Sequence, residues 1–215
     1  MKLGSLAQQI VLAKLNHLLK PDTTAGDLAR MFSTGSKEVS MATDRLVRLG
    51  ILGKRRGQGS LVHHILYDWH KSGRELWEYA LPYMRSPVVE TLPSLEPPNP
   101  ADFTPGGESL LAVRSPWYVL HTPPCLASLR RSTKGNATRI PSAPRSSATH
   151  VIEFWRYPPF LPGLAEIDNL SLYLALASAT DRSAKLYSWV LLETFDFDGD
   201  EKLRSPSRSC EIFLP

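Results

Sequence analysis

The stretch TTAGDLARMFSTGSKEVSMATDRLVRLGILGKRRGQGS, from Thr23 to Ser60, decides the fold of the first part of this chain. It predicts a short helix over about 24–32, in which Thr23 or Thr24 caps the N-terminus and Asp27 completes a capping box. After a break at 33–36, a second helix is predicted over 36–49. Its core-facing positions recur at helical spacing: Val39, Ala42, Thr43, Leu46 and Val47. Gly50 ends this helix, at the position where a left-handed residue is preferred.

The segments on either side of this stretch complete the pattern. Upstream, apolar residues at helical spacing predict a helix from about residue 6 to 20, which Pro21 stops. Downstream, two short strands at 51–55 and 61–67 flank a turn at 57–60 whose glycines suit a hairpin. A further helix is predicted over 72–83. The order is therefore helix, helix, turn, helix and hairpin.

This order resembles the winged helix-turn-helix superfamily. The segments that carry the resemblance are TTAGDLARMF, STGS, SKEVSMATDRLVRLGIL and GKRRGQGS, and it covers roughly the first 70 residues. The resemblance implies that the third helix enters the DNA major groove and that the wing reaches the backbone or the minor groove. The expected DNA-binding residues are polar or cationic for the most part: Ser36, Lys37, Ser40, Met41, Asp44, Arg45, Arg48, Lys54, Arg55, Arg56 and Gln58.

Each of these cations has an expected role. Arg45 can offer a bidentate fork to a guanine, whereas Lys37 and Arg48, nearer the helix ends, suit phosphates. The wing residues Lys54 and Arg55, with Arg56 beside them, add three charges for the DNA backbone. The competing interpretation is that this helix face is only solvated, or that the same fold binds another protein.

The distribution of charge favours the first part as the DNA-binding end. The 215-residue chain has a formal net charge of +4, with 25 Lys and Arg against 21 Asp and Glu. Thirteen basic and seven acidic residues lie at or before Arg85, a net of +6, whereas the remainder has a net of −2. A polyanion is therefore expected to bind the first part.

A proline-rich segment at 86–105 predicts an extended linker between two domains. The expected organisation is a winged helix domain at 1–85, this linker, and a small mixed α+β domain at 106–215, so that the whole chain is α+β. In the second domain the pattern predicts a short helix after a glycine turn within 106–115, helices at 170–179 and 181–193, and strands at 117–120 and 150–157. The segment 128–149, rich in Ser, Arg and Pro, is predicted to be a mobile basic loop.

The second domain has a resemblance of its own. The segments GGESLLA, VIEFWRYPP and IDNLSLYLAL look like the C-terminal part of a group of bacterial winged-helix proteins, and more broadly like winged-helix antitoxins of abortive-infection toxin–antitoxin systems. The resemblance implies repression of the protein's own promoter and a toxin as partner. The charged residues within these segments could form a buried ion-pair network, an effector site or a partner contact: Glu108, Glu153, Arg156 and Asp168.

Catalytic and metal-binding chemistry is not indicated, and we expect no enzyme activity, no cofactor and no metal. His63 and His64 are adjacent in a predicted strand and would point to opposite faces. Cys125 with His121 or His150 is a conceivable nucleophilic pair, but a loop or core thiol is the simpler interpretation. The acidic run at 196–201 lacks the glutamate of a calcium loop and is predicted to be a solvated tail.

The sequence therefore predicts a sequence-specific double-stranded DNA-binding transcriptional regulator, acting as a repressor. The alternative is an antitoxin or protein-interaction module whose C-terminal domain binds a partner protein. A homodimer is expected, with the helices at 6–20 and 72–83 as candidate self-association surfaces. Apolar runs are too short to span a bilayer and the N-terminus lacks a signal-peptide core, so we expect a cytoplasmic protein with no membrane partner.

Overall fold

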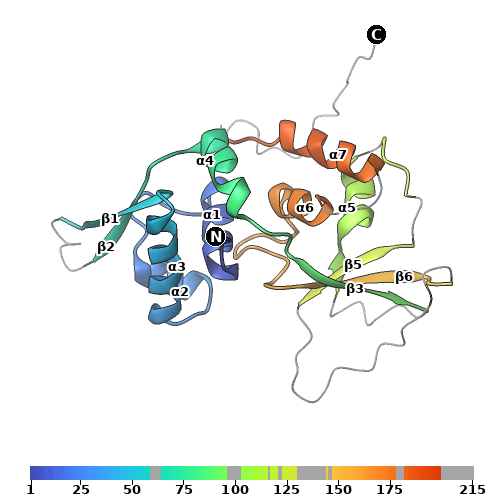
Figure 1. Ribbon diagram of the computed structural model, residues 1–215, viewed down its shortest axis with the longest axis horizontal. Helices are drawn as coiled ribbons and strands as arrows, with labels where there is room; N and C mark the ends of the chain where they lie inside the picture. Colours follow the sequence, from blue (N-terminus) through green and yellow to red (C-terminus); the bar gives the residue numbers. More distant parts are fainter. Residues whose placement is uncertain are drawn as a thin grey trace, which may run out of the picture.

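The protein has a mixed α+β fold with two small sheets, as the sequence predicts (Figure 1). The computed structural model describes residues 1–58, 64–95, 103–115, 117–120, 123–129, 144, 147–177 and 182–199. Helices and a two-stranded sheet form one half of the molecule, and a four-stranded sheet with helices on one face forms the other. In the part of the chain so described, no helix is both long and apolar enough to cross a bilayer.

The first half contains the predicted order of elements. Helices α1 (Ser5–Leu15), α2 (Ala25–Met31) and α3 (Ser36–Arg48) precede the antiparallel pair β1 (Leu52–Arg56) and β2 (Ile65–Trp69). Helix α4 (Gly73–Ala80) follows, and a short 3-10 turn η2 (Leu81–Tyr83) extends it.

Local signals set several of these boundaries. The capping box of α2 is confirmed: the Asp27 amide donates to Thr24 Oγ1 at 3.2 Å, and the Thr24 amide donates to Asp27 Oδ2 at 2.8 Å. Gly50 has φ +67°, which confirms its predicted left-handed role after α3. The first helix is shorter than predicted, because His17 adopts a left-handed φ of 56° two residues after Leu15. The second strand also lies later than predicted. Residues 59–63, which include the second half of the predicted turn at 57–60, lie outside the described part.

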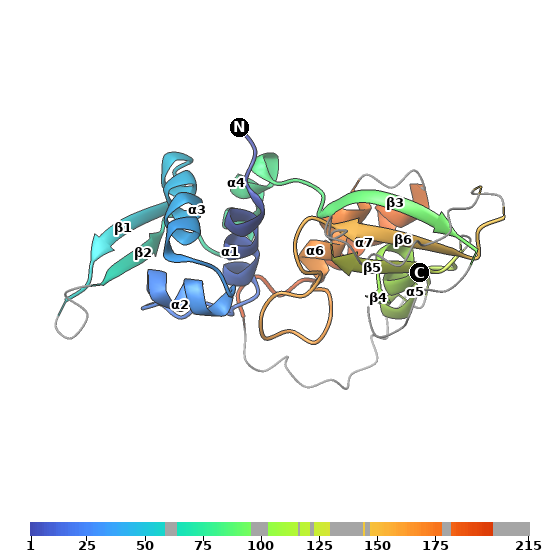
Figure 2. The ribbon, with the colours of Figure 1, turned by 90° about the horizontal axis from the view of Figure 1, so that it is seen from below.

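The second half is built on a four-stranded sheet. Strands β3 (Val88–Ser94), β4 (Thr104–Pro105), β5 (Cys125–Leu129) and β6 (His150–Trp155) have the order β3-β6-β5-β4. The pairings of β3 with β6 and of β4 with β5 are antiparallel, and β5 runs parallel to β6. Helices α5 (Gly107–Arg114) and α6 (Asn169–Leu176) lie on one face of the sheet, and α7 (Arg182–Glu193) packs on these two helices, farther from the sheet (Figures 1 and 2).

The expected linker at 86–105 is wrong, because β3 and β4 lie within it. Both strands are edge strands of the sheet, and an edge tolerates proline because the missing N–H need not pair with a neighbour on both sides. Pro93 is paired opposite Val151 in β3, and Pro105 ends β4. The prolines of this segment lie in and around the edge strands of a sheet, whereas the sequence pattern predicts a linker.

Two further predictions for the second half are corrected. Residues 117–120 form no strand; Tyr118 instead turns inward, and its hydroxyl donates to Glu108 at 3.0 Å. Strand β5 was not predicted, and it includes Cys125 together with the first two residues of the predicted loop at 128–149. Most of that loop, and His121, lie outside the described residues.

The two halves share a continuous hydrophobic core that includes residues of both. Helix α1 is buried along most of its length, and Gln8 on this helix donates through Nε2 to the Tyr157 hydroxyl at 2.9 Å. Trp77 on α4 meets Tyr173 on α6 edge to face, with ring centroids 5.6 Å apart. The apolar faces of α1 and α4, which the sequence suggested as self-association surfaces, thus pack largely within the chain.

Candidate nucleic-acid interface

Helix α3 packs through one face and leaves the other uncovered. Val39, Thr43 and Leu46 are fully buried, and Ala42 is 7% exposed. The Thr43 hydroxyl donates to the Val39 carbonyl at 3.0 Å, so its polar group is satisfied inside the core. Val47, which was predicted to face the core, is 37% exposed. The buried stripe is therefore narrower than predicted, and the solvent-facing side is correspondingly wider.

The uncovered face of α3 carries polar, cationic and apolar side chains. Its exposed members include six of the predicted set: Ser36, Lys37, Ser40, Met41, Asp44 and Arg48. Glu38 and Val47, which were not in that set, are also exposed. Met41 is 63% exposed, which is unusual for a methionine on a packed helix. The face thus offers hydroxyl groups, two cations, two carboxylates and two apolar side chains along a single helix.

Strand β1 brings further cations beside α3. Lys54, Arg55 and Arg56 are consecutive and exposed, and Gln58 follows them, also exposed. Because side chains alternate along a strand, Lys54 and Arg56 lie on one face and Arg55 on the other. Arg55 Nε donates to Asp68 Oδ1 on β2 at 2.7 Å. The three cations were predicted to act together, but only Lys54 and Arg56 share a face.

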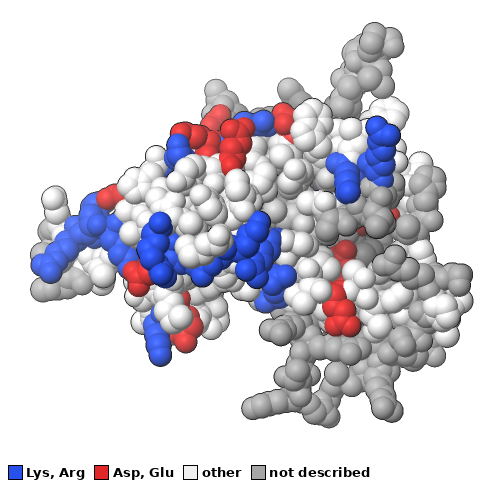
Figure 3. Space-filling view, in the orientation of Figure 1, with Lys and Arg blue, Asp and Glu red and all other residues white. Residues whose placement is uncertain are grey.

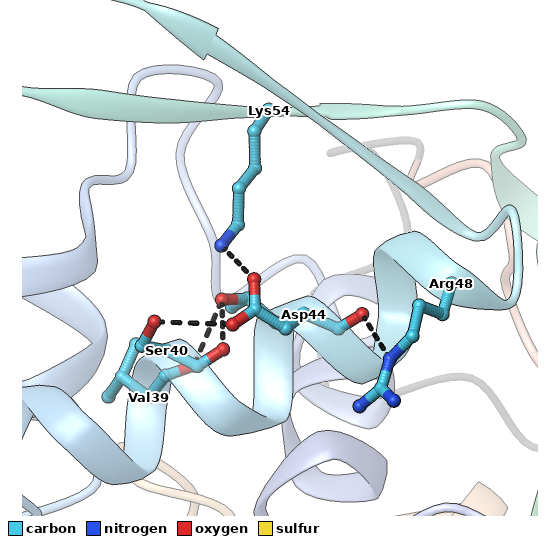
Figure 4. A network of polar contacts seen from close by, with 6 residues as sticks. Val39, Ser40, Asp44, Arg48 and Lys54 are labelled. Carbon is cyan, nitrogen blue, oxygen red and sulfur yellow. Dashed lines mark hydrogen bonds and ion pairs between the residues drawn. The ribbon is translucent and has the colours of Figure 1, made fainter.

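Asp44 connects the helix to the hairpin (Figure 4). Lys54 Nζ lies 2.5 Å from Asp44 Oδ1, Ser40 Oγ donates to Asp44 Oδ2 at 3.4 Å, and Arg48 Nε donates to the Asp44 carbonyl at 3.4 Å. The hydrogen bond from Lys54 is the largest cause that lowers the pKa of the Asp44 carboxyl below its usual value. Asp44 is therefore an anion that holds Lys54 against α3, rather than a group free to contact a base.

Arg45 does not extend from the uncovered face as predicted. Its guanidinium donates to the carbonyl of Lys2, and its Nε is buried without a hydrogen-bond partner. The side chain lines a shallow groove of about 390 Å³ between α3 and the beginning of α1, where Gly4, just before the helix, and Leu6 also line it. This contact could not be predicted from neighbouring residues, because Arg45 and Lys2 are 43 positions apart.

Lys and Arg side chains form a broken band across this face of the molecule. It runs from the β1–β2 hairpin over α3 toward the middle of the chain's long axis (Figure 3). Among the residues that the structure describes, Lys37 and Arg56 donate no hydrogen bond and form no ion pair. These two side chains are available to a polyanion without breaking an existing contact.

The charged residues singled out in the second half do not form one network. Asp168 caps α6 by accepting from the Ser171 amide at 2.9 Å, and it also accepts from Asn16 Nδ2 at 3.3 Å. Burial, and then the Asp168 charge, raise the pKa of the Tyr157 hydroxyl far above its usual value. Asp168 is therefore placed where the two halves meet, as a structural cap.

The other three charged residues each have local partners. Glu108 accepts from the Tyr118 hydroxyl at 3.0 Å, and buried Glu153 accepts from the Trp155 indole at 3.1 Å. Arg156 Nε donates to the Ser86 carbonyl at 2.9 Å. These contacts favour organisation of the sheet and its edge over an effector site.

Asp196 and Asp198, at the beginning of the acidic run, are exposed to solvent as predicted. They do not lie on a free tail, because Asp196 Oδ1 accepts from the amides of Asp198 and Gly199, at 3.1 and 2.8 Å, and Phe197 is 7% exposed within the core. Residues from 200 onward lie outside the described part. Within the described ranges, no three His, Cys, Asp or Glu side chains come together as a metal site would require. His64 is exposed, and His63 lies outside the described residues.

Comparison of the chain with protein-family models, with curated proteins and with solved structures gives no match. The candidate interface therefore rests on the residues and contacts described above.

Proposed function

We propose that this protein binds double-stranded DNA through the uncovered face of α3 and the adjoining face of β1, as a winged helix-turn-helix transcriptional regulator of the cytoplasm. The observation that carries the proposal is the placement of Lys54 and Arg56 beside a helix whose polar and cationic side is uncovered. The order of three helices and an antiparallel hairpin supports the same proposal.

The dimensions of α3 suit a major groove. The helix has 13 residues, and a helix of this kind enters a groove about 12 Å wide. Ser40, in the middle of the uncovered face, can donate to or accept from base edges, and Met41 offers an apolar surface to a thymine methyl group. Lys37 and Arg48 lie toward opposite ends of the helix, where phosphates of the two groove walls would be reached.

Asp44 tunes the charge of this face. Its carboxylate repels DNA phosphates, and it forms an ion pair with Lys54 until a phosphate replaces it. An exposed ion pair contributes only about 0–1 kcal/mol, so exchange of the carboxylate for a phosphate requires little free energy. In this proposal Lys54 changes partner on binding, while Arg56 is free throughout.

Removal of the hairpin cations tests the proposal. We expect the variant Lys54→Ala/Arg55→Ala/Arg56→Ala to bind a random 30-base-pair duplex about 10- to 100-fold more weakly than wild type, by fluorescence anisotropy at fixed salt, because phosphate contacts dominate such affinity. Lys185→Gln removes one charge from α7 in the other half of the molecule and serves as the control, with affinity changed less than twofold. Equal affinity of wild type and the triple variant would reject the proposal.

Arg45 and Arg48 lie on the same helix, α3, but are expected to have different roles. Arg48→Ala should weaken DNA binding by about three- to tenfold because Arg48 is exposed on the proposed contact face. Arg45→Ala should change DNA affinity less than Arg48→Ala and lower thermal stability, because Arg45 contacts the Lys2 carbonyl inside the chain. The reverse ranking in DNA affinity would show that Arg45 turns outward to bind DNA.

A further inference from the structure

The solvent-facing side of α7 is apolar at its centre. Leu186 is 60% exposed, Trp189 is 52% exposed and Val190 is 38% exposed. The opposite side of the same helix is buried through four residues: Ala184, Ser188, Leu191 and Leu192. Helix α7 therefore has two apolar faces, of which the residues that the structure describes cover only one.

The segment after α5 contacts α7. Tyr118 packs its ring edge to face against Tyr187 of α7, with centroids 5.5 Å apart. Its two neighbours, Trp117 and Val119, are 60% and 64% exposed. This segment therefore adds exposed apolar side chains near α7, and large exposed apolar patches mark interaction sites in monomers.

The charges of α7 are placed against its own helix dipole. Exposed Arg182 and Lys185 lie in the first turn, and exposed Glu193 ends the helix. A cation near a helix N-terminus and an anion near its C-terminus are both unfavourable for that helix. Each charge would be favourable beside an antiparallel neighbour, because the N-terminus of one helix then lies beside the C-terminus of the other.

The outward residues are also arranged symmetrically along the helix. Arg182, Leu186, Trp189 and Glu193 recur at spacings of four, three and four residues and form one stripe. A two-fold axis midway between Leu186 and Trp189 would place Leu186 against the Trp189 of a second copy and Arg182 against its Glu193. Such a self-complementary surface is what an isologous interface requires.

We propose that α7 pairs antiparallel with α7 of a second copy of this chain, so that the uncovered apolar face is a homodimer interface. Glu193 already accepts two hydrogen bonds from Arg74, at 2.8 and 3.2 Å, and its side chain remains 37% exposed. The outer lone pairs of that carboxylate are open to Arg182 of the second copy. This proposal goes beyond DNA binding and does not depend on it.

Oligomeric state provides the first test. By analytical ultracentrifugation of the full chain without DNA, wild type should show a concentration-dependent dimer, and Trp189→Asp should raise the dimer dissociation constant at least tenfold. Val89→Asp is the matched control, since Val89 on β3 is an apolar residue of similar exposure, 50% against 52% for Trp189. Far-ultraviolet circular dichroism should match wild type for both variants, because both positions face solvent.

Cysteine cross-linking tests the antiparallel register. A mixture of Leu186→Cys chains and Trp189→Cys chains should form mixed disulfide dimers faster than either variant does alone, with wild type as the blank for native Cys125 and Cys210. A monomeric wild type at all concentrations would overturn the proposal, as would a dimer unaffected by Trp189→Asp. Faster cross-linking of Leu186→Cys with itself would also overturn it, because it indicates parallel helices.

Discussion

Helices α3 and α7 have the same construction and different solvent-facing chemistry. Each buries one face in the shared core and leaves the opposite face uncovered. On α3 the uncovered side presents Lys37, Ser40 and Arg48, whereas on α7 it presents Leu186, Trp189 and Val190. Packing requirements fix only the inner face of a surface helix, so the outer face is where the two helices differ in function. A polyanion suits the first helix and a second apolar surface suits the other.

Disruption of the core that supports both helices is expected to have the largest effect on the protein. Trp77→Ala should lower the free energy of unfolding by about 3–5 kcal/mol, because the side chain is 2% exposed and packs on Tyr173. Chemical denaturation followed by tryptophan fluorescence and circular dichroism checks this value. Glu78→Ala, on the same helix but exposed, is the control and should change stability by less than about 0.5 kcal/mol.

The same experiment shows whether the two halves are coupled. One core includes residues of both halves, so both probes should report a single transition in wild type. Two separate transitions, with Trp77→Ala shifting only one of them, would contradict a shared core and restore the picture of two independent domains.

The buried side-chain amide of Gln8 on α1 forms a hydrogen bond between the two halves of the molecule, so its removal tests how strongly they are coupled. Gln8→Leu should lower the free energy of unfolding by about 1–3 kcal/mol, because it removes the partner of the buried Tyr157 hydroxyl and of the part-buried Arg85 backbone. Tyr157→Phe should cost less, since Gln8 Nε2 still donates to the Arg85 carbonyl at 2.8 Å. Thermal unfolding of the three proteins measures the order, and an equal cost for both variants would indicate that Gln8 contributes only through Tyr157.

The N-terminal cap of α2, the helix that precedes α3, is expected to contribute to stability in a pH-dependent way. Thr24→Ala should cost about 1 kcal/mol, since the side chain accepts from the Asp27 amide. Hydrogen bonds from Thr24 lower the pKa of Asp27, so this contribution is complete above the unfolded-state value near 3.8 and is lost as pH falls through the lower folded value. Stability of wild type should therefore fall more steeply than that of Thr24→Ala below about pH 4. Parallel pH curves would exclude this linkage.

The smallest expected effect concerns Asp44. Its lowered pKa keeps it ionised at neutral pH, so Asp44→Asn removes a full negative charge and frees Lys54. Affinity for random duplex DNA should rise by about two- to fivefold, in keeping with the small energy of an exposed ion pair. Glu90→Gln, which removes one exposed acid from β3, is the control. Weaker binding of Asp44→Asn would indicate that the carboxylate itself contacts DNA bases.

Sequence reasoning succeeded where the deciding interactions are local. The pair Thr24 and Asp27, the stripe Val39, Ala42 and Leu46, and the left-handed Gly50 all act within one helix or its end. Such interactions leave a signal within a few neighbouring residues, so α2 and α3 were predicted nearly to their observed bounds.

It failed where the deciding partner is distant in sequence. Strand β3 is held by β6, with Val88 opposite Trp155, and its prolines hid it because edge strands tolerate them. Arg45 was assigned to a base because nothing nearby indicates that Lys2 lies within reach. The same limit applies to Arg55, whose partner Asp68 is brought close only by the hairpin register.

The salt dependence of DNA binding tests the central claim most directly. Each phosphate that a cation neutralises contributes a slope of about −0.9 to log K against log salt concentration. With contacts from Lys37, Arg48, Lys54 and Arg56, wild type should give a slope of about −3 to −4 on a random duplex, and the hairpin triple variant a slope shallower by about 2. Absence of binding at low salt, or the same slope for both proteins, would contradict DNA recognition through α3 and β1.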